Sequence, residues 1–89
     1  MKVDFNGSVD ELAYIFKVLV ESGMITCRTK SEMYDVIVNN FRTKKTEDIS
    51  KNSLKNKYNV PQLSAVESVN EKMRYLRQLS LKKLAEMSA

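Results

Sequence analysis

The sequence contains no histidine, one cysteine, one proline and two glycines among its 89 residues. Without histidine, a single chain cannot build a serine–histidine–acid triad, a cysteine–histidine pair or a histidine-containing zinc site. The single thiol, Cys27, excludes an internal disulfide. We expect this thiol to be a small buried group, since free cysteine is usually buried. A reducing compartment suits such a chain, so the sequence predicts a cytoplasmic protein.

No apolar run approaches the roughly 20 residues needed to cross a membrane, and the opening stretch MKVDF contains no apolar signal segment. We therefore expect no membrane partner. The two glycines, Gly7 and Gly23, are too few for a phosphate-binding loop, and no calcium-loop pattern occurs. The carboxylates of the first apolar stretch are spaced as helix caps and surface groups. The sequence therefore predicts no enzymatic activity, metal, cofactor or small-molecule substrate.

The net charge of +4 is unevenly distributed along the chain. Residues 1–41 carry four bases and six acids, a balance of −2, whereas residues 42–57 carry six bases and two acids, a balance of +4. Residues 58–89 carry five bases and three acids, which adds the remaining +2. Such an asymmetry indicates an anionic partner, and a solvated lysine-rich surface is the alternative explanation.

The stretch over residues 9–20 is strongly apolar and predicts the central helix, ending near residue 22. Ser8 followed by Glu11 is a capping box, in which each side chain meets the backbone amide of the other residue. Gly23 ends the helix, because glycine adopts a positive φ at little cost. The polar residues form only a narrow stripe, made of Asp10, Tyr14, Lys17 and Glu21. We therefore expect this helix to be buried on more than one side.

Two shorter helices are expected next. Thr29 and Glu32 form a second capping box, and the helix that follows has one apolar face, made of Met33, Tyr34, Ile37, Val38 and Phe41. Residues 42–46 are expected to form a polar loop. A third helix is expected to start near residues 46–49 and to end near Tyr58, with lysine and asparagine on its surface.

The last helix is expected to be the longest. Pro61 favours a turn before it, because the residue preceding a proline is driven toward extended geometry. Ser64 and Glu67 form a third capping box, and a helix from there to residue 87 is about 36 Å long. Its apolar stripe consists of Val66, Val69, Met73, Leu76, Leu84 and Met87. This stripe exceeds what three short helices cover, so we expect its end near Leu84 and Met87 to overhang, and there either to fray or to form a weak homodimer.

These elements predict a single all-α domain over residues 1–89. It is a small four-helix domain with a helix-turn-helix-like trihelical core and a longer C-terminal helix that closes the bundle. In such a core the third helix enters the major groove of DNA. Asparagine pairs with adenine, and lysine contacts guanine or phosphate. The predicted DNA-binding residues are Arg42, Lys44, Lys45, Lys51, Asn52, Lys55 and Asn56.

Several short segments carry a family resemblance. FNGS at residues 5–8, Leu12 and ESGMI at residues 21–25 resemble the C-terminal region of RteC-like proteins, regulators found on conjugative elements of Bacteroides-type bacteria. FRTKK at residues 41–45 and SLKNKY at residues 53–58 resemble small relatives with a similar segment. The resemblance implies a helix-turn-helix or winged-helix DNA-binding domain. Residues 58–63 are too few for a β-hairpin wing, so a wing is not expected.

The sequence therefore predicts a small DNA-binding or regulatory module of helix-turn-helix type, linked to a mobile element, with duplex DNA as its partner. A protein-interaction or dimerisation module that acts through the C-terminal helix is the alternative. The salt dependence of binding to DNA, compared with the concentration dependence of molecular mass, distinguishes the two.

Overall fold

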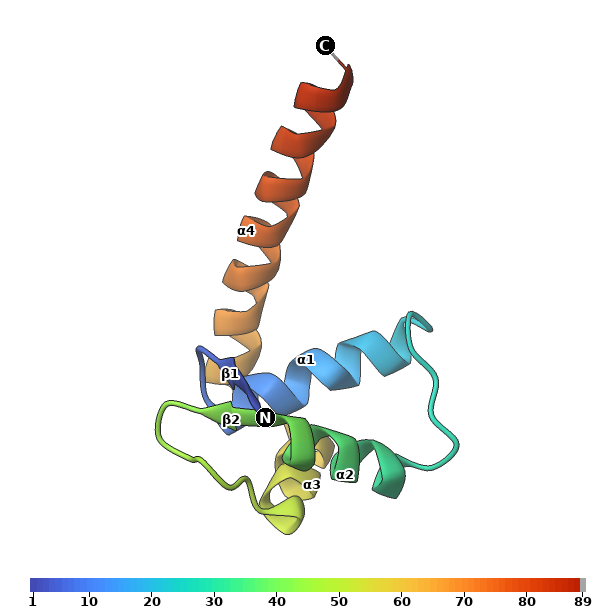
Figure 1. Cartoon of the computed structure of the whole chain (residues 1–89), viewed down its shortest axis with the longest axis vertical. Coiled ribbons are helices and arrows are strands. Elements are labelled where there is room, and N and C mark those ends of the chain that lie inside the picture. The colour runs from blue at the N-terminus through green and yellow to red at the C-terminus, as the bar shows by residue number, and fades with distance from the viewer. Residues whose placement is uncertain (89) are drawn as a thin grey trace.

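The computed structural model describes residues 1–88 and contains four helices and one two-stranded sheet (Figure 1). The elements in chain order are β1 (Val3–Phe5), α1 (Val9–Glu21), α2 (Lys30–Asn40), β2 (Phe41–Thr43), α3 (Lys51–Asn59) and α4 (Leu63–Ser88). The last residue of the domain predicted over residues 1–89 lies outside the described part. The four predicted helices are confirmed, and the chain is mostly helical.

The all-α prediction is wrong in one respect, because β1 and β2 pair as parallel strands. In this pair Val3 lies opposite Phe41, and Asp4 lies opposite Arg42. The strand β2 occupies the start of the segment predicted to be a polar loop. Val3 and Phe5 alternate with Asp4 and Asn6, which allows a short extended segment, but the partner of each paired residue lies 38 positions away. Their pairing is therefore a long-range contact that local sequence does not reveal.

The helix boundaries follow side chains that cap the exposed backbone amides. The Ser8 hydroxyl accepts from the amide of Glu11, and the Glu11 carboxylate accepts from the amide of Ser8, both at 3.1 Å, as predicted. The Thr29 hydroxyl accepts from the amide of Glu32 at 3.1 Å. Gly23 adopts the predicted positive φ of 82°. These local signals therefore place the start of α1, its end and the start of α2.

Two later boundaries differ from the prediction. The α3 helix begins at Lys51, after Ser50 accepts from the amide of Ser53 at 3.3 Å. The α4 helix begins at Leu63, so Ser64 lies inside it and the capping box predicted there is wrong. Cys27 is also exposed rather than buried, because it belongs to the connection between α1 and α2, which runs over the surface (Figure 1).

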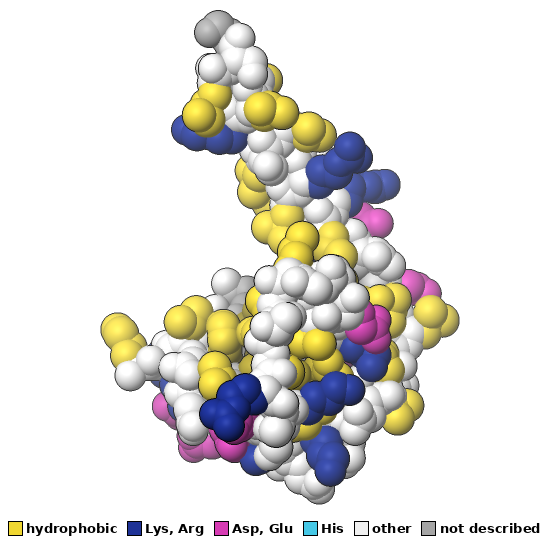
Figure 2. Space-filling model, turned by 90° about the vertical axis from the view of Figure 1, so that its right-hand side faces the viewer, with side chains coloured by type: hydrophobic (Ala, Val, Ile, Leu, Met, Phe, Trp, Pro, Cys, Tyr) yellow, Lys and Arg dark blue, Asp and Glu magenta, His cyan; other side chains and the backbone are white. Residues whose placement is uncertain are grey.

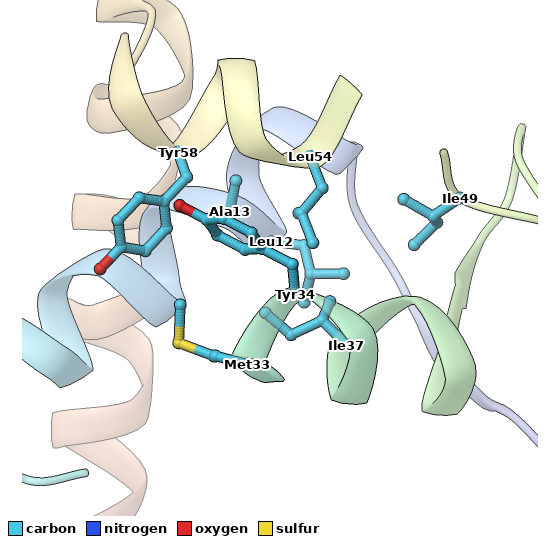
Figure 3. Close-up of a cluster of buried hydrophobic side chains, with 8 residues drawn as sticks. All are labelled: Leu12, Ala13, Met33, Tyr34, Ile37, Ile49, Leu54 and Tyr58. Atoms are coloured by element: carbon cyan, nitrogen blue, oxygen red, sulfur yellow. The ribbon is translucent and has the colours of Figure 1, made fainter. Parts of the chain in front are cut away.

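The hydrophobic core lies where α1, α2 and α3 meet (Figure 3). The Tyr34 and Tyr58 rings pack edge to face, with centroids 5.4 Å apart, and this contact joins α2 to α3. The buried members of the cluster are Leu12, Ala13, Met33, Tyr34, Ile37, Ile49, Leu54 and Tyr58. Each of the three helices thus contributes at least two buried side chains, so the core depends on all three helices together.

The α1 helix is covered unevenly. Its fully buried residues are Leu12 and Ala13, while Ile15, Phe16, Val18 and others on its remaining apolar faces are only half-buried. The expectation that this helix is buried on more than one side is confirmed, because both α3 and α4 pack against it and no residue from Val9 to Val20 is exposed. One side stays partly open, because α4 crosses the start of α1 and then diverges from it (Figure 1).

The α4 helix has two dissimilar halves. Ala65 and Val69 are buried against the rest of the chain, whereas every residue of the segment 74–88 is exposed. We call residues 1–73 the body and residues 74–88 the projecting segment. Because this segment extends away from the body, the molecule is 47 Å long and about 30 Å wide (Figure 1). The predicted overhang is confirmed and begins earlier than expected, so only the first half of α4 closes the bundle. Neither α4 nor any other helix within residues 1–88 is long and apolar enough to span a membrane.

Candidate nucleic-acid interface

The outer face of α3 carries a continuous polar stripe. Because Leu54 and Tyr58 point into the core, the opposite face of the helix is turned to solvent. Four exposed residues at positions i, i+3, i+4 and i+7 occupy that face: Asn52, Lys55, Asn56 and Asn59. We call them the α3 stripe. The sequence of α3 contains no acidic residue, so nothing on this helix repels a polyanion.

Three of the predicted DNA-binding residues, Asn52, Lys55 and Asn56, belong to the α3 stripe, and the fourth member was missed. The sequence predicts that the helix ends near Tyr58, whereas α3 continues to Asn59. One more residue of helix adds Asn59 to the same face as Asn52 and Asn56. Proline cannot continue a helix, so extending the predicted helix to the residues just before Pro61 would have included Asn59.

Lys51 and Arg42, also predicted to bind DNA, are engaged within the body. The Lys51 ammonium lies 2.9 Å from the carboxylate of Asp35 and donates to the hydroxyl of Ser31, also at 2.9 Å. These contacts fasten the start of α3 to α2. The Arg42 guanidinium pairs with Asp4 across the strand pair, and this hydrogen bond lowers the pKa of Asp4. The charges of both bases are therefore compensated by carboxylates of the body.

Lys44 and Lys45 follow β2 directly and are exposed. Neither forms an ion pair with any of residues 1–88. Together with Lys72 and the start of α1 at Gly7 and Ser8, they line a surface hollow of about 380 Å³. The structure therefore leaves these two lysines available to an anionic partner, in contrast to Arg42.

The remaining bases around α3 contact groups of the body. Lys57 lies 3.7 Å from the carboxylate of Asp10, and Lys17 and Lys30 lie over the Tyr58 ring, 4.8 Å and 5.6 Å from its centroid. Such cation–π contacts fix the position of Tyr58 and so help to hold α3 against α1. Lys55 is therefore the single base of the α3 stripe, whereas Lys57, Lys17 and Lys30 help to anchor the helix.

The connection between α2 and α3 is longer than in a typical helix-turn-helix. It covers residues 41–50 and includes β2, whereas the usual turn has about 3–4 residues. The Thr43 and Thr46 backbones hydrogen-bond to each other and close a turn within it. The pairing of β2 with β1 and this turn give the longer connection a defined course, so that Ile49 reaches the core before α3 begins.

No protein-family model, curated protein or solved structure matches this chain. Within the described residues, no group of three or more carboxylate, thiol or imidazole side chains is placed to hold a metal ion. The candidate functional features of the described residues are therefore surfaces, namely the α3 stripe, the two lysines after β2 and the projecting segment.

Proposed function

We propose that this chain is a small regulatory module that binds duplex DNA through the α3 stripe. The observation that carries the proposal is a short helix with an acid-free, asparagine-rich face turned away from the core. Asparagine can pair bidentately with adenine in the major groove, and lysine can contact guanine or phosphate. A helix in that position acts as the recognition helix of a helix-turn-helix protein, despite the longer connection before it.

Lys44 and Lys45 supply phosphate contacts in this proposal. Contacts to phosphate position a protein on the duplex, and contacts to bases select the sequence. The two lysines are exposed and carry uncompensated charge within the body, so binding DNA breaks no ion pair that the body uses. Arg42 and Lys51 instead have a structural role in this proposal, since their ion pairs hold β2 and α3 in place.

The firm seating of α3 also supports this proposal. Leu54 and Tyr58 are completely buried beneath the stripe, and the Lys51–Asp35 pair fastens the start of the helix. A recognition surface on a rigid element loses less conformational entropy on binding than a surface on a loop. The resemblance to RteC-like regulators adds the further proposal that the module belongs to a mobile element and acts in the cytoplasm, without catalytic activity.

The test is fluorescence anisotropy of labelled duplexes over a salt series. Each phosphate that the protein neutralises adds roughly 0.9 to the slope of log affinity against log salt. Replacing Lys44 and Lys45 with alanine should therefore flatten this slope by about 1.8. The matched control replaces Arg74 and Lys82, two exposed bases of the projecting segment. This control variant also loses two positive charges, but from the projecting segment, so most of the slope of log affinity against log salt should remain.

Asn56→Ala should act differently from the lysine variants. It should keep the salt slope and lose preference among duplexes selected from a random pool, by about 1–3 kcal/mol for a lost bidentate base contact. Two outcomes contradict the proposal: wild-type protein without salt-sensitive binding at low ionic strength, and a control variant that flattens the slope as much as the loss of Lys44 and Lys45.

A further inference from the structure

The projecting segment exposes an apolar line that has no partner in a single copy of the chain. The line continues the buried face of α4, since at roughly 100° per residue the same side of the helix recurs every three to four positions. Its members after Val69 and Met73 are Leu76, Leu84 and Met87, which are 63%, 61% and 76% exposed. Ser80 interrupts the line, and Leu79, which is 48% exposed, lies at its edge. Hydrophobic side chains are visible along this part of the molecule (Figure 2).

A second unfilled apolar surface lies beside the first. The second half of α1 and the middle of α4 border a groove of about 330 Å³. Its walls are mainly the side chains of Ile15, Val18, Leu19, Met24, Met73 and Leu76. This groove is the side of α1 that the body leaves partly open. The apolar line of α4 continues into this groove, since Leu76 is a member of the line and also borders the groove.

The exposed area is larger than a compact monomer of this size requires. A compact protein of 10.3 kDa is expected to expose about 5,350 Å², whereas this chain exposes 6535 Å². The excess is about 1,200 Å² per copy, and a standard stable interface takes about 800 Å² from each partner. The radius of gyration, 14.4 Å, likewise exceeds the roughly 12 Å of a compact chain of this length. The surplus surface is therefore sufficient for a stable dimer.

We propose that a second copy of this chain covers both surfaces, with the two α4 helices packed antiparallel about a two-fold axis near Leu79. In this register Leu79 lies beside its own counterpart, and Leu84 of one copy lies level with Met73 of the other. Met87 of each copy then enters the groove between α1 and α4 of its partner. A parallel pairing leaves both grooves empty, because neither tip reaches the partner's body.

The two grooves select the antiparallel direction. Charge does not favour it, because in this register Lys82 and Lys83 of one copy lie close to Arg74 and Arg77 of the other. This dimer does not depend on DNA binding.

Sedimentation equilibrium across micromolar to millimolar concentrations tests the interface. The wild-type mass should rise from 10.3 kDa toward twice that value. Leu84→Asp should weaken association at least about tenfold, because it removes a buried side chain and introduces a charge at the interface. The matched control is Gln78→Asp, since Gln78 is also exposed but lies on the opposite side of the helix from the line through Val69 and Met87. It should associate like the wild type.

Both variants should melt like the wild type in dilute solution, because Gln78 and Leu84 are both exposed in a single copy of the chain. Loss of association by Leu84→Asp is therefore separable from loss of folding. A wild-type mass that stays at that of one chain at every concentration overturns the proposal. Equal damage from Gln78→Asp, or an undisturbed dimer in Leu84→Asp, overturns it as well.

Disulfide trapping tests the orientation, with Cys27→Ser as the background. Chains with Met73→Cys, mixed with chains carrying Leu84→Cys, should give a mixed disulfide under mild oxidation. Leu84→Cys alone should not form a covalent dimer, since its two copies are about 16 Å apart along antiparallel helices. Efficient self-crosslinking of Leu84→Cys indicates a parallel pair and contradicts the proposed arrangement.

Discussion

The body and the projecting segment are built from similar proportions of apolar and charged residues, yet they are stabilised in different ways. In the body, side chains from three helices bury one another, and the helices are short. No residue of the projecting segment is buried, and its helix continues from a packed start through Leu, Lys, Arg, Glu, Met and Ala, which are good helix formers. Once a helix is nucleated, each further residue adds a hydrogen bond at little cost. A helix can therefore extend beyond the core that started it.

Glu11 connects these two regions. Its carboxylate accepts from Ser68 and from the Lys72 ammonium of α4, each at 2.6 Å, and from the amide of Ser8 in its own helix cap. Only 13% of its side chain is exposed. One carboxylate thus closes the start of α1 and fastens the root of α4, so the direction in which the projecting segment leaves the body depends on it.

The largest expected difference between the regions comes from removing one leucine from each. Leu54 is fully buried, so Leu54→Ala should lower the free energy of unfolding by about 2–5 kcal/mol. Leu84→Ala, in dilute solution, should change it by less than about 0.5 kcal/mol, because Leu84 is exposed. Urea unfolding followed by circular dichroism measures both. Equal losses would show that the two regions are packed alike and that the comparison is wrong.

An intermediate effect is expected from the carboxylate that joins the regions. Desolvation raises the pKa of Glu11, but hydrogen bonds from Lys72, Ser68 and the Ser8 backbone outweigh it and lower the pKa from 4.5 to about 2. Its contribution to stability is therefore complete above pH 4.5 and lost as the pH falls toward 2. The loss should amount to about 2–3 kcal/mol.

Urea unfolding at a series of acidic pH values measures this loss. Glu11→Gln should flatten the pH dependence over that range and lower stability at neutral pH. The matched control is Glu67→Gln, an exposed carboxylate on the same helix as Ser68 and Lys72. If the Glu11 variant retained the full acid sensitivity, this carboxylate would not be the joint between body and α4.

The smallest effect on stability is expected from replacing Lys17, a lysine of α1 that lies over the Tyr58 ring. The Lys17 ammonium lies 4.8 Å from the centroid of the Tyr58 ring, so Lys17→Ala should cost about 0.5–1 kcal/mol. The sequence assigns Lys17 to a polar stripe and predicts no cost. Lys83→Ala in the projecting segment provides the baseline for an exposed lysine. Thermal unfolding of both variants in dilute solution compares them, and identical curves would show that the Tyr58 contact contributes nothing.

The local sequence determined much of this protein. Ser8, Thr29 and Gly23 place the ends of α1 and the start of α2, because capping and positive φ depend on residues within one helical turn. The outer face of α3 was also predicted, apart from Asn59, because helical periodicity alone separates Asn52, Lys55 and Asn56 from the buried Leu54. The overhang of α4 was foreseen from the length of its apolar stripe.

The tertiary structure alone decided the remaining features. It paired β1 with β2, engaged Arg42 with Asp4 and Lys51 with Asp35, and left one side of α1 open beside α4. Each of these joins residues far apart in the chain, and the free energy of such contacts depends on how whole helices are packed, not on neighbouring residues. The local sequence therefore determines where a helix starts and which of its faces is apolar. Packing decides which apolar face is covered and which charged side chain remains without an ion-pair partner.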